Sequence, residues 1–122
     1  MDLDGEKKFV NILIKDIANI EKTTQEVHAR LNLDEDREEG EEELSALKKK
    51  VQEFKELAVK HYKDKDVMKI VQEIGLYEVI GGGFDGILSQ LDTLKKTKEY
   101  NTKIYEENVK KIIDALARII NK

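Results

Sequence analysis

The sequence predicts an all-α fold, an antiparallel bundle of about four helices that forms a single domain over residues 1–122. Apolar residues recur at alternating spacings of three and four, which is the pattern of helices that pack against one another. The chain contains no proline, so no residue of that kind breaks the pattern. Its length of 122 residues fits one domain with its own core. The predicted helices lie near 4–31, 41–62, 66–79 and 85–120; the alternative is a three-helix version in which the second and third helices are continuous.

The first predicted helix, near 4–31, carries the most regular apolar seam. Thr24 fills the one gap in it, and Asp4 is the expected N-cap because its carboxylate can accept a hydrogen bond from the first turn. The apolar seam residues are Val10, Leu13, Ile17, Ile20, Val27 and Leu31. We therefore expect Ile17 to lie in a packed core.

The second predicted helix, near 41–62, has the same spacing, but the pattern changes phase at 63–66. The apolar stripe then moves to another face, so we expect a short turn there, with Asp64 or Asp66 capping the third helix. The seam of the second helix consists of Leu44, Leu47, Val51, Phe54, Ala58 and His61, and the next stripe of Val67, Ile70, Val71 and Ile74.

Three consecutive glycines, Gly81-Gly82-Gly83, are predicted to end the third helix in a loop, because glycine is costly inside helices and favours loops. Asp85 would then cap a long last helix, near 85–120, whose buried face includes Leu116. That face is interrupted by polar residues, so we expect the helix to be partly exposed or bent at mid-length. The interrupting residues are Lys98, Asn101 and Thr102.

The segment from 32 to 43 has no apolar periodicity and is strongly acidic. Eight acids lie in 34–43, Arg37 is the only base there, and Gly40 is expected to break the helix. We expect a solvated loop that runs into a helix start. Because such a cluster attracts basic partners, its acids are candidate partner-binding residues; the alternative is that the segment only aids solubility. The candidates are Asp36, Glu38, Glu39, Glu41 and Glu42.

Two aromatic residues are further candidates for partner binding. Phe84 is expected in the glycine loop, and Tyr100 lies off the main apolar stripe. Exposed aromatic side chains are typical anchors of protein interfaces. The alternative for Phe84 is that it tucks under the loop as a hydrophobic contact that ends the helix.

The sequence favours no enzymatic activity, no cofactor and no metal site. It has no cysteine, which excludes disulfides, thiolate zinc sites and a cysteine nucleophile. Residues 81–86 match G-x-G-x-x-G, but a dinucleotide site also needs a strand–helix–strand unit, and no second strand is predicted. The acids from Asp34 lack the glycine and glutamate that a calcium-binding EF-hand loop requires. His28 and His61 are expected to be partly buried packing residues.

Charge and hydropathy also restrict the class of partner. A net charge of −4 with only three arginines argues against nucleic acid. No apolar run approaches the ~18–20 residues that span a bilayer, so no transmembrane segment is expected. The first residues are acidic, unlike a signal peptide, although a signal or lipid-anchor segment further upstream is compatible with the sequence. A protein is the expected partner, and the oligomeric state is left open.

In composition and texture the chain resembles the small helical outer-surface lipoproteins of relapsing-fever and Lyme spirochaetes. The resemblance lies in a Lys-, Ile-, Asn- and Glu-rich composition without proline or tryptophan, in the helical segment 10–15, and in the glycine-broken segment 80–86 before a Lys-rich terminal helix. Proteins of that kind are tethered by an N-terminal lipidated cysteine, and several capture host complement regulators such as factor H. This chain has no cysteine, so such a tether would have to precede residue 1.

Two classes of function remain. The first is a non-enzymatic protein-binding module, a receptor at the cell surface for a basic host protein such as a complement regulator, as the resemblance implies. The alternative is a cytoplasmic helical adaptor or a self-associating coiled-coil protein. A lipidation-type cysteine just upstream of residue 1 in the full-length gene would favour the first class.

Overall fold

The computed structural model describes residues 2–122, and helices joined by short loops are the only regular secondary structure in that range. The helices are α1 (Leu3–Leu31), α2 (Arg37–Lys63), α3 (Lys65–Val71), α4 (Leu76–Thr97) and α5 (Thr102–Ile120). The prediction of an all-α bundle is therefore confirmed. The segment Leu76–Ile80, which could also have been a strand before a dinucleotide-binding turn, is the first part of α4.

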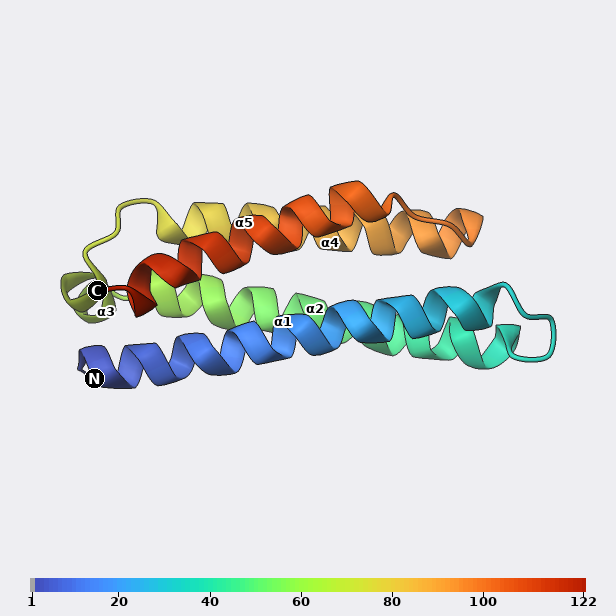
Figure 1. Cartoon of the computed structure of the whole chain (residues 1–122), viewed down its shortest axis with the longest axis horizontal. Coiled ribbons are helices and arrows are strands. Elements are labelled where there is room, and N and C mark those ends of the chain that lie inside the picture. The colour runs from blue at the N-terminus through green and yellow to red at the C-terminus, as the bar shows by residue number, and fades with distance from the viewer. Residues whose placement is uncertain (1) are drawn as a thin grey trace.

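The four long helices run up, down, up and down along a common axis (Figure 1). Around the bundle, α1 packs on α2, α2 on α4, α4 on α5, and α5 returns to α1. The short helix α3 lies at one end, where α1 begins and α5 ends (Figure 1). The loop between α1 and α2 and the turn between α4 and α5 lie at the opposite end.

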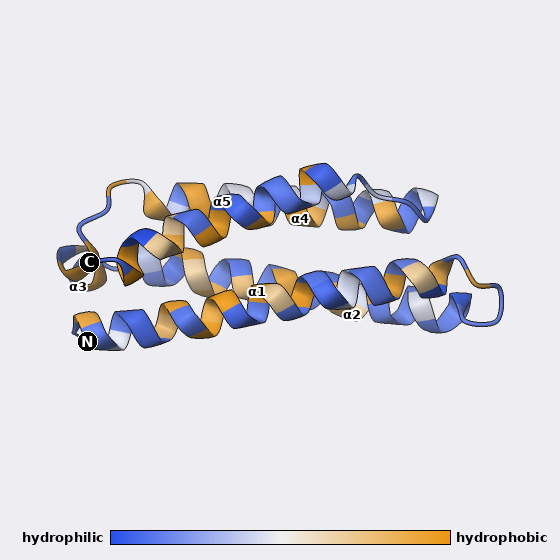
Figure 2. Cartoon of the chain, in the orientation of Figure 1, coloured by the Kyte–Doolittle hydropathy of each residue, from blue (hydrophilic) through white to orange (hydrophobic). Residues whose placement is uncertain are grey.

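One continuous apolar core runs the length of the bundle. Figure 2 shows apolar residues recurring as bands along each long helix, as the seam spacing predicted. In α1 every seam residue from Val10 to Leu31 is buried, and so is Thr24. The Thr24 hydroxyl bonds within the core to the carbonyl oxygen of Ile20 and to the hydroxyl of Tyr105, at 2.8 and 2.7 Å. Ile17 and Leu116 are both buried, as predicted.

The predicted glycine loop is wrong, because Gly81, Gly82 and Gly83 lie inside α4. Here glycine serves close packing between helices rather than a turn. A Cβ atom on Gly83 would overlap the side chain of Ile112 in α5 and lie 3.1 Å from the carbonyl oxygen of Asn108. The missing side chain lets the two backbones approach, and the surrounding core contacts offset the poor helix propensity of glycine.

The predicted last helix near 85–120 is also wrong, because the chain reverses between α4 and α5. Lys98 ends α4 in a left-handed conformation (φ 62°), and its N–H donates to the Leu94 carbonyl oxygen at 2.8 Å. Asn101 then caps α5, with its side-chain oxygen accepting from the N–H of Ile104 at 3.0 Å. The polar residues that interrupted the apolar face therefore mark a turn and not a bend.

Two further boundaries differ from the sequence prediction. The third helix was predicted near 66–79 but ends at Val71, after which Gln72 and Gly75 adopt positive φ angles. Gly40 does not break a helix; it lies inside α2, which begins at Arg37, and it is buried against Arg30 and Leu31 of α1. A larger side chain there would push the two helices apart.

The capping predictions were partly confirmed. Asp64 caps α3 by accepting from the N–H groups of Asp66 and Val67, as expected. The N-cap of α1 is Asp2 and not Asp4, and its carboxylate accepts from the N–H of Gly5 at 2.8 Å. Asp85 caps nothing, because it lies within α4 and pairs with Lys55 of α2 at 2.5 Å.

Over residues 2–122, no helix combines the length and apolarity that crossing a bilayer requires.

Candidate functional site

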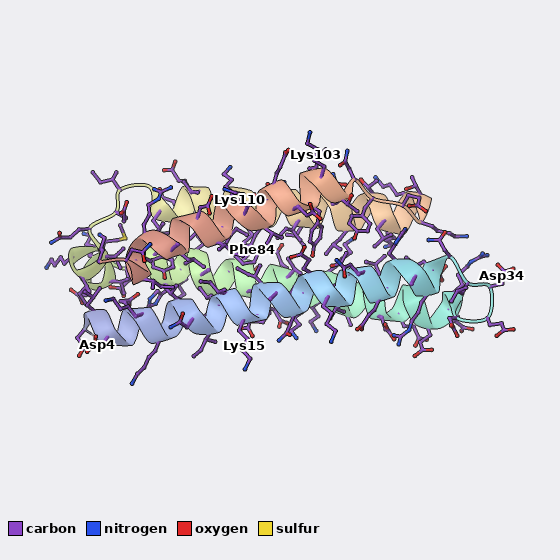
Figure 3. All side chains as sticks on the ribbon, in the orientation of Figure 1. Asp4, Lys15, Asp34, Phe84, Lys103 and Lys110 are labelled. Carbon is purple, nitrogen blue, oxygen red and sulfur yellow. The ribbon has the colours of Figure 1, made fainter. Side chains whose placement is uncertain are left out.

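The acidic residues lie at the end of the bundle opposite the two termini. They come from the loop after α1 and from the first two turns of α2, and Figure 3 shows Asp34 at that tip. Asp34 pairs with Arg37 at 2.6 Å, and Glu43 pairs with Arg30 of α1. The other six acids form no ion pair within residues 2–122. These six, which we call the acidic end, are Glu35, Asp36, Glu38, Glu39, Glu41 and Glu42.

Helix electrostatics accounts for part of the acidic end. Glu38 and Glu39 lie in the first turn of α2, where the positive end of the helix dipole favours negative charge. Asp36 holds the N-cap position but makes no side-chain capping bond. Glu41 and Glu42 are exposed beyond the first turn, where the dipole contributes little. The charge at this end therefore exceeds what stabilising the helix start requires.

An exposed leucine lies within the acidic loop. Leu33 retains 54% of its surface accessible, and the residues on both sides of it, Asn32 and Asp34, are exposed as well. Leu33 was not among the predicted partner-binding residues, although an isolated apolar residue in a polar loop is a signal that could have identified it. Leu33 gives the acidic end an apolar contact point.

The loop is fastened to the turn between α4 and α5. The side-chain nitrogen of Asn32 donates to the carbonyl oxygens of His28 and Lys98, each at 2.9 Å. Nearby, His28 Nε2 lies 2.9 Å from a carboxylate oxygen of Glu99. These bonds join the ends of α1 and α4, so the acidic loop starts from a defined position.

Tyr100 lies at this same end, whereas Phe84 does not. The Tyr100 ring packs edge-on against His28 and Tyr105, with centroid distances of 5.4 and 5.5 Å, and it is only partly buried. Burial, followed by the nearby carboxylates of Glu21 and Glu106, raises the pKa of Tyr100. Phe84 has no exposed surface and lies at mid-bundle (Figure 3), so its prediction as a loop anchor is wrong.

A pocket of about 370 Å³ opens beside the acidic end, between α1, α2 and α4. Its apolar lining is Leu31 and Leu44, each of which retains only 2% of its surface accessible. Its polar lining residues are Glu41, Ser45, Lys95 and Lys98. A second depression, of about 240 Å³, lies between α1 and α2 next to Ile20 and Leu47. The larger pocket alone includes one of the predicted partner-binding acids, Glu41.

A buried carboxylate lies at the other end of the bundle. Glu6 of α1 has no exposed surface, and its two oxygens lie 3.0 and 3.1 Å from Nε2 of His61 in α2. The Phe9 ring covers that histidine at a centroid distance of 4.0 Å. The neighbouring Tyr62 hydroxyl is buried without a hydrogen-bond partner, and burial, followed by the charge of Glu6, raises the pKa of Tyr62.

This carboxylate–histidine pair is best interpreted as part of the packing between α1 and α2. Glu6 and His61 join α1 to α2 directly, and neither of the two pockets described above is lined by Glu6, His61 or Tyr62. His28 and His61 are both half-buried, as the sequence predicted. The buried Glu6 was missed, although it occupies the seam position four residues before Val10.

Across residues 2–122, no three histidine or carboxylate side chains come together in a way that could hold a metal ion. The G-x-G-x-x-G match lies within α4, where its backbone N–H groups are used in helical hydrogen bonds and no strand precedes it. No protein-family model, no curated protein and no solved structure matches this chain.

Proposed function

We propose that the chain is a non-enzymatic protein-binding module that recognises a basic segment of another protein at the acidic end of the bundle. One observation carries this proposal: six carboxylates that form no ion pair within residues 2–122 lie at the same tip of the bundle as the exposed Leu33. Charge of one sign speeds the encounter with an oppositely charged partner, and an apolar contact then slows its release. Nucleic acid is not the proposed partner, because its phosphates would be repelled.

The cellular setting of the proposal rests on the resemblance to spirochaete surface lipoproteins. In that setting the chain is displayed at the cell surface, anchored by a lipidated segment upstream, and its partner is a basic host protein such as a complement regulator. The position of the acidic end is compatible with this setting, because it lies opposite the N-terminus (Figure 1). A tether at the N-terminus would direct the acidic end away from the membrane.

The test compares two charge-neutralised variants that have the same net charge. The first changes Glu38, Glu39, Glu41 and Glu42 to Gln, which preserves size and helix propensity. The control changes four exposed acids elsewhere, Glu53, Glu56, Glu106 and Glu107, to Gln. The probe is a helical peptide of about 16 residues with a leucine stripe between two rows of lysine.

We expect the first variant to associate with the peptide about tenfold more slowly than the control at low salt. The difference should disappear near 1 M salt, where the screening length is about 3 Å. Equal association rates for the two variants would refute the acidic end as the recognition surface.

The second candidate is the alternative named above, a cytoplasmic helical adaptor or a self-associating coiled-coil protein. A specific observation supports self-association. Ile12 of α1 and Leu57 of α2 are large apolar residues on paired helices, with 60% and 51% of their surfaces exposed. A second copy of the chain could cover them. Analytical ultracentrifugation over a range of protein concentrations tests this by measuring the oligomeric state. The double variant Ile12→Lys with Leu57→Lys should abolish any dimer that buries these two side chains.

A further inference from the structure

The larger pocket interrupts a regular series of ion pairs between α2 and α4. Lys55 pairs with Asp85 and Lys48 with Asp92, so the pairs are repeated at seven-residue intervals on both helices. One further interval along α2 reaches Glu41, where the sign of the charge is reversed. The same interval along α4 reaches Glu99, which lies beyond the end of that helix at Thr97 and pairs with His28. The residues from the end of α4 that line the pocket are Lys95 and the C-cap Lys98.

The opposite charges at this third level do not pair. Glu41, Lys95 and Lys98 take part in no ion pair within residues 2–122, and the pocket of about 370 Å³ lies between them. Its floor is formed by Leu31 and Leu44, which belong to the core. The helices therefore present an apolar cavity whose α2 wall is negative and whose α4 wall is positive.

The positive wall is held in place by backbone contacts. Lys98 is the C-cap of α4; its N–H donates to the Leu94 carbonyl oxygen, and its own carbonyl oxygen accepts from Asn32. On the facing wall, Glu41 and Ser45 are one helical turn apart on α2. The backbone of both walls therefore lies within a helix or at its C-cap.

We infer that this pocket receives an apolar side chain from the partner segment, and that a base and an acid flank that side chain on opposite sides. The base meets Glu41 and the acid meets Lys95 and Lys98, while the apolar side chain covers Leu31 and Leu44. This inference rests on the proposed function and narrows it. A segment that is basic on both sides can still meet the acidic end, but its second row of bases would face the two lysines, so it should bind more weakly than a segment with a base on one side and an acid on the other.

The decisive variant fills the pocket from its rim. Ser45→Phe places a large side chain at an exposed pocket-lining position and leaves the core residues unchanged. Gln52→Phe is the matched control, because Gln52 is exposed, lies seven residues further along the same face of α2, and lines neither pocket. Both variants should retain the wild-type circular dichroism spectrum and melting temperature.

Two helical peptides of about 16 residues serve as probes. The mixed peptide carries a leucine stripe with lysine along one side and glutamate along the other, and the basic peptide carries lysine along both sides. Binding is measured by fluorescence anisotropy, and amide chemical shifts locate the peptide on the protein. We expect the mixed peptide to shift the amide signals of Leu31 and Leu44.

Ser45→Phe should weaken binding of the mixed peptide about tenfold, and Gln52→Phe less than about twofold. Lys95→Glu with Lys98→Glu should reverse the preference, so that the basic peptide binds more tightly than the mixed one. If the basic peptide binds the wild-type acidic end and is unaffected by Ser45→Phe, the pocket inference fails while the proposed function stands. If neither peptide shifts any amide at the acidic end, both fail.

Discussion

The glycines of α4 offer a direct test of how closely the helices pack. Gly82 and Gly83 are adjacent interior residues of the same helix, so replacing either with alanine brings the same gain in helix propensity, about 0.5–1 kcal/mol. Their surroundings differ. A Cβ atom on Gly82 would meet only Nζ of Lys111, at 3.3 Å, which is the end of a flexible and exposed side chain.

At Gly83 the added atom has no such freedom. It would overlap Cγ1 of Ile112, a residue without exposed surface, and would also lie 3.1 Å from the backbone carbonyl oxygen of Asn108. Relief would require α5 to move away from α4, and overpacking of this kind costs about 1–3 kcal/mol. Because the propensity gain is common to both substitutions, the difference between the two variants measures the clash alone.

We therefore expect Gly82→Ala to raise the free energy of unfolding by about 0.5–1 kcal/mol. The free energy of unfolding of Gly83→Ala should be about 1–3 kcal/mol lower than that of Gly82→Ala. Urea denaturation followed by circular dichroism measures both values, and equal m-values would show that the variants unfold from comparable states. The stability of Gly86→Ala should lie between those of the other two variants. The added methyl group would displace the Asn108 side chain, which can rotate away but then loses its hydrogen bond to the Ile104 carbonyl oxygen. Equal stability of Gly82→Ala and Gly83→Ala would refute the close approach of α4 and α5.

Three other predictions concern stability. Burial raises the pKa of Tyr62 and Tyr105 above the ordinary value of about 10, so the unfolded chain loses these protons first. The contribution of these two groups to the free energy of unfolding should be constant below pH ~10 and should fall above it by up to about 1.4 kcal/mol per pH unit for each tyrosine. Tyr62→Phe should remove about half of that slope in urea titrations from pH ~9 to ~11, and an unchanged slope would contradict the assignment. Ile17→Ala or Leu116→Ala should lower the free energy of unfolding by about 2–5 kcal/mol, because each leaves a cavity in the core. Lys49→Ala, at an exposed position, should change it by less than about 0.5 kcal/mol. Equal shifts in melting temperature would show that the buried and exposed faces are misassigned. His61→Ala should lower the free energy of unfolding by about 3–5 kcal/mol, because it leaves the Glu6 carboxylate buried without a partner. The double variant Glu6→Leu with His61→Phe removes that carboxylate and should cost far less. A double variant as unstable as His61→Ala would argue against that cause.

The sequence predicted the helical class and the seam of α1 because both follow from local periodicity. Every seam residue from Val10 to Leu31 is buried, and even the polar Thr24 was assigned to the interior. Each such residue faces the core because of its position on its own helix. No knowledge of the neighbouring helices was needed for that inference.

The errors arose where a neighbouring helix determines the structure. Gly81-Gly82-Gly83 favour a loop when considered alone, but their lack of side chains is what permits close contact with α2 and α5. Phe84 was misplaced for the same reason, since its burial follows from the helix that contains it. Conversely, Lys98 and Asn101 form a reversal that includes two bonds to other elements: Asn32 of the loop after α1 donates to the Lys98 carbonyl oxygen, and the Asn101 N–H donates to the side-chain oxygen of Gln90 in α4.

The acidic end shows the same difference between features set by local sequence and features set by contacts between helices. The sequence located the charges correctly, because a run of acids without apolar periodicity has no place in a core. It could not find the pocket, because Leu31, Leu44 and Lys98 come from three helices and meet only in the folded bundle.

The fold itself does not require the charge of the acidic end. Glu38 and Glu39 benefit from the helix dipole, and Asp34 and Glu43 have arginine partners, but Glu41 and Glu42 have neither. Like charges crowded at one tip repel each other, so neutralising them should leave the free energy of unfolding unchanged or slightly raised. Glu41 and Glu42 have no such role in the bundle, and Glu41 lines a pocket with walls of opposite charge. A partner explains these two charges more readily than the needs of the bundle do.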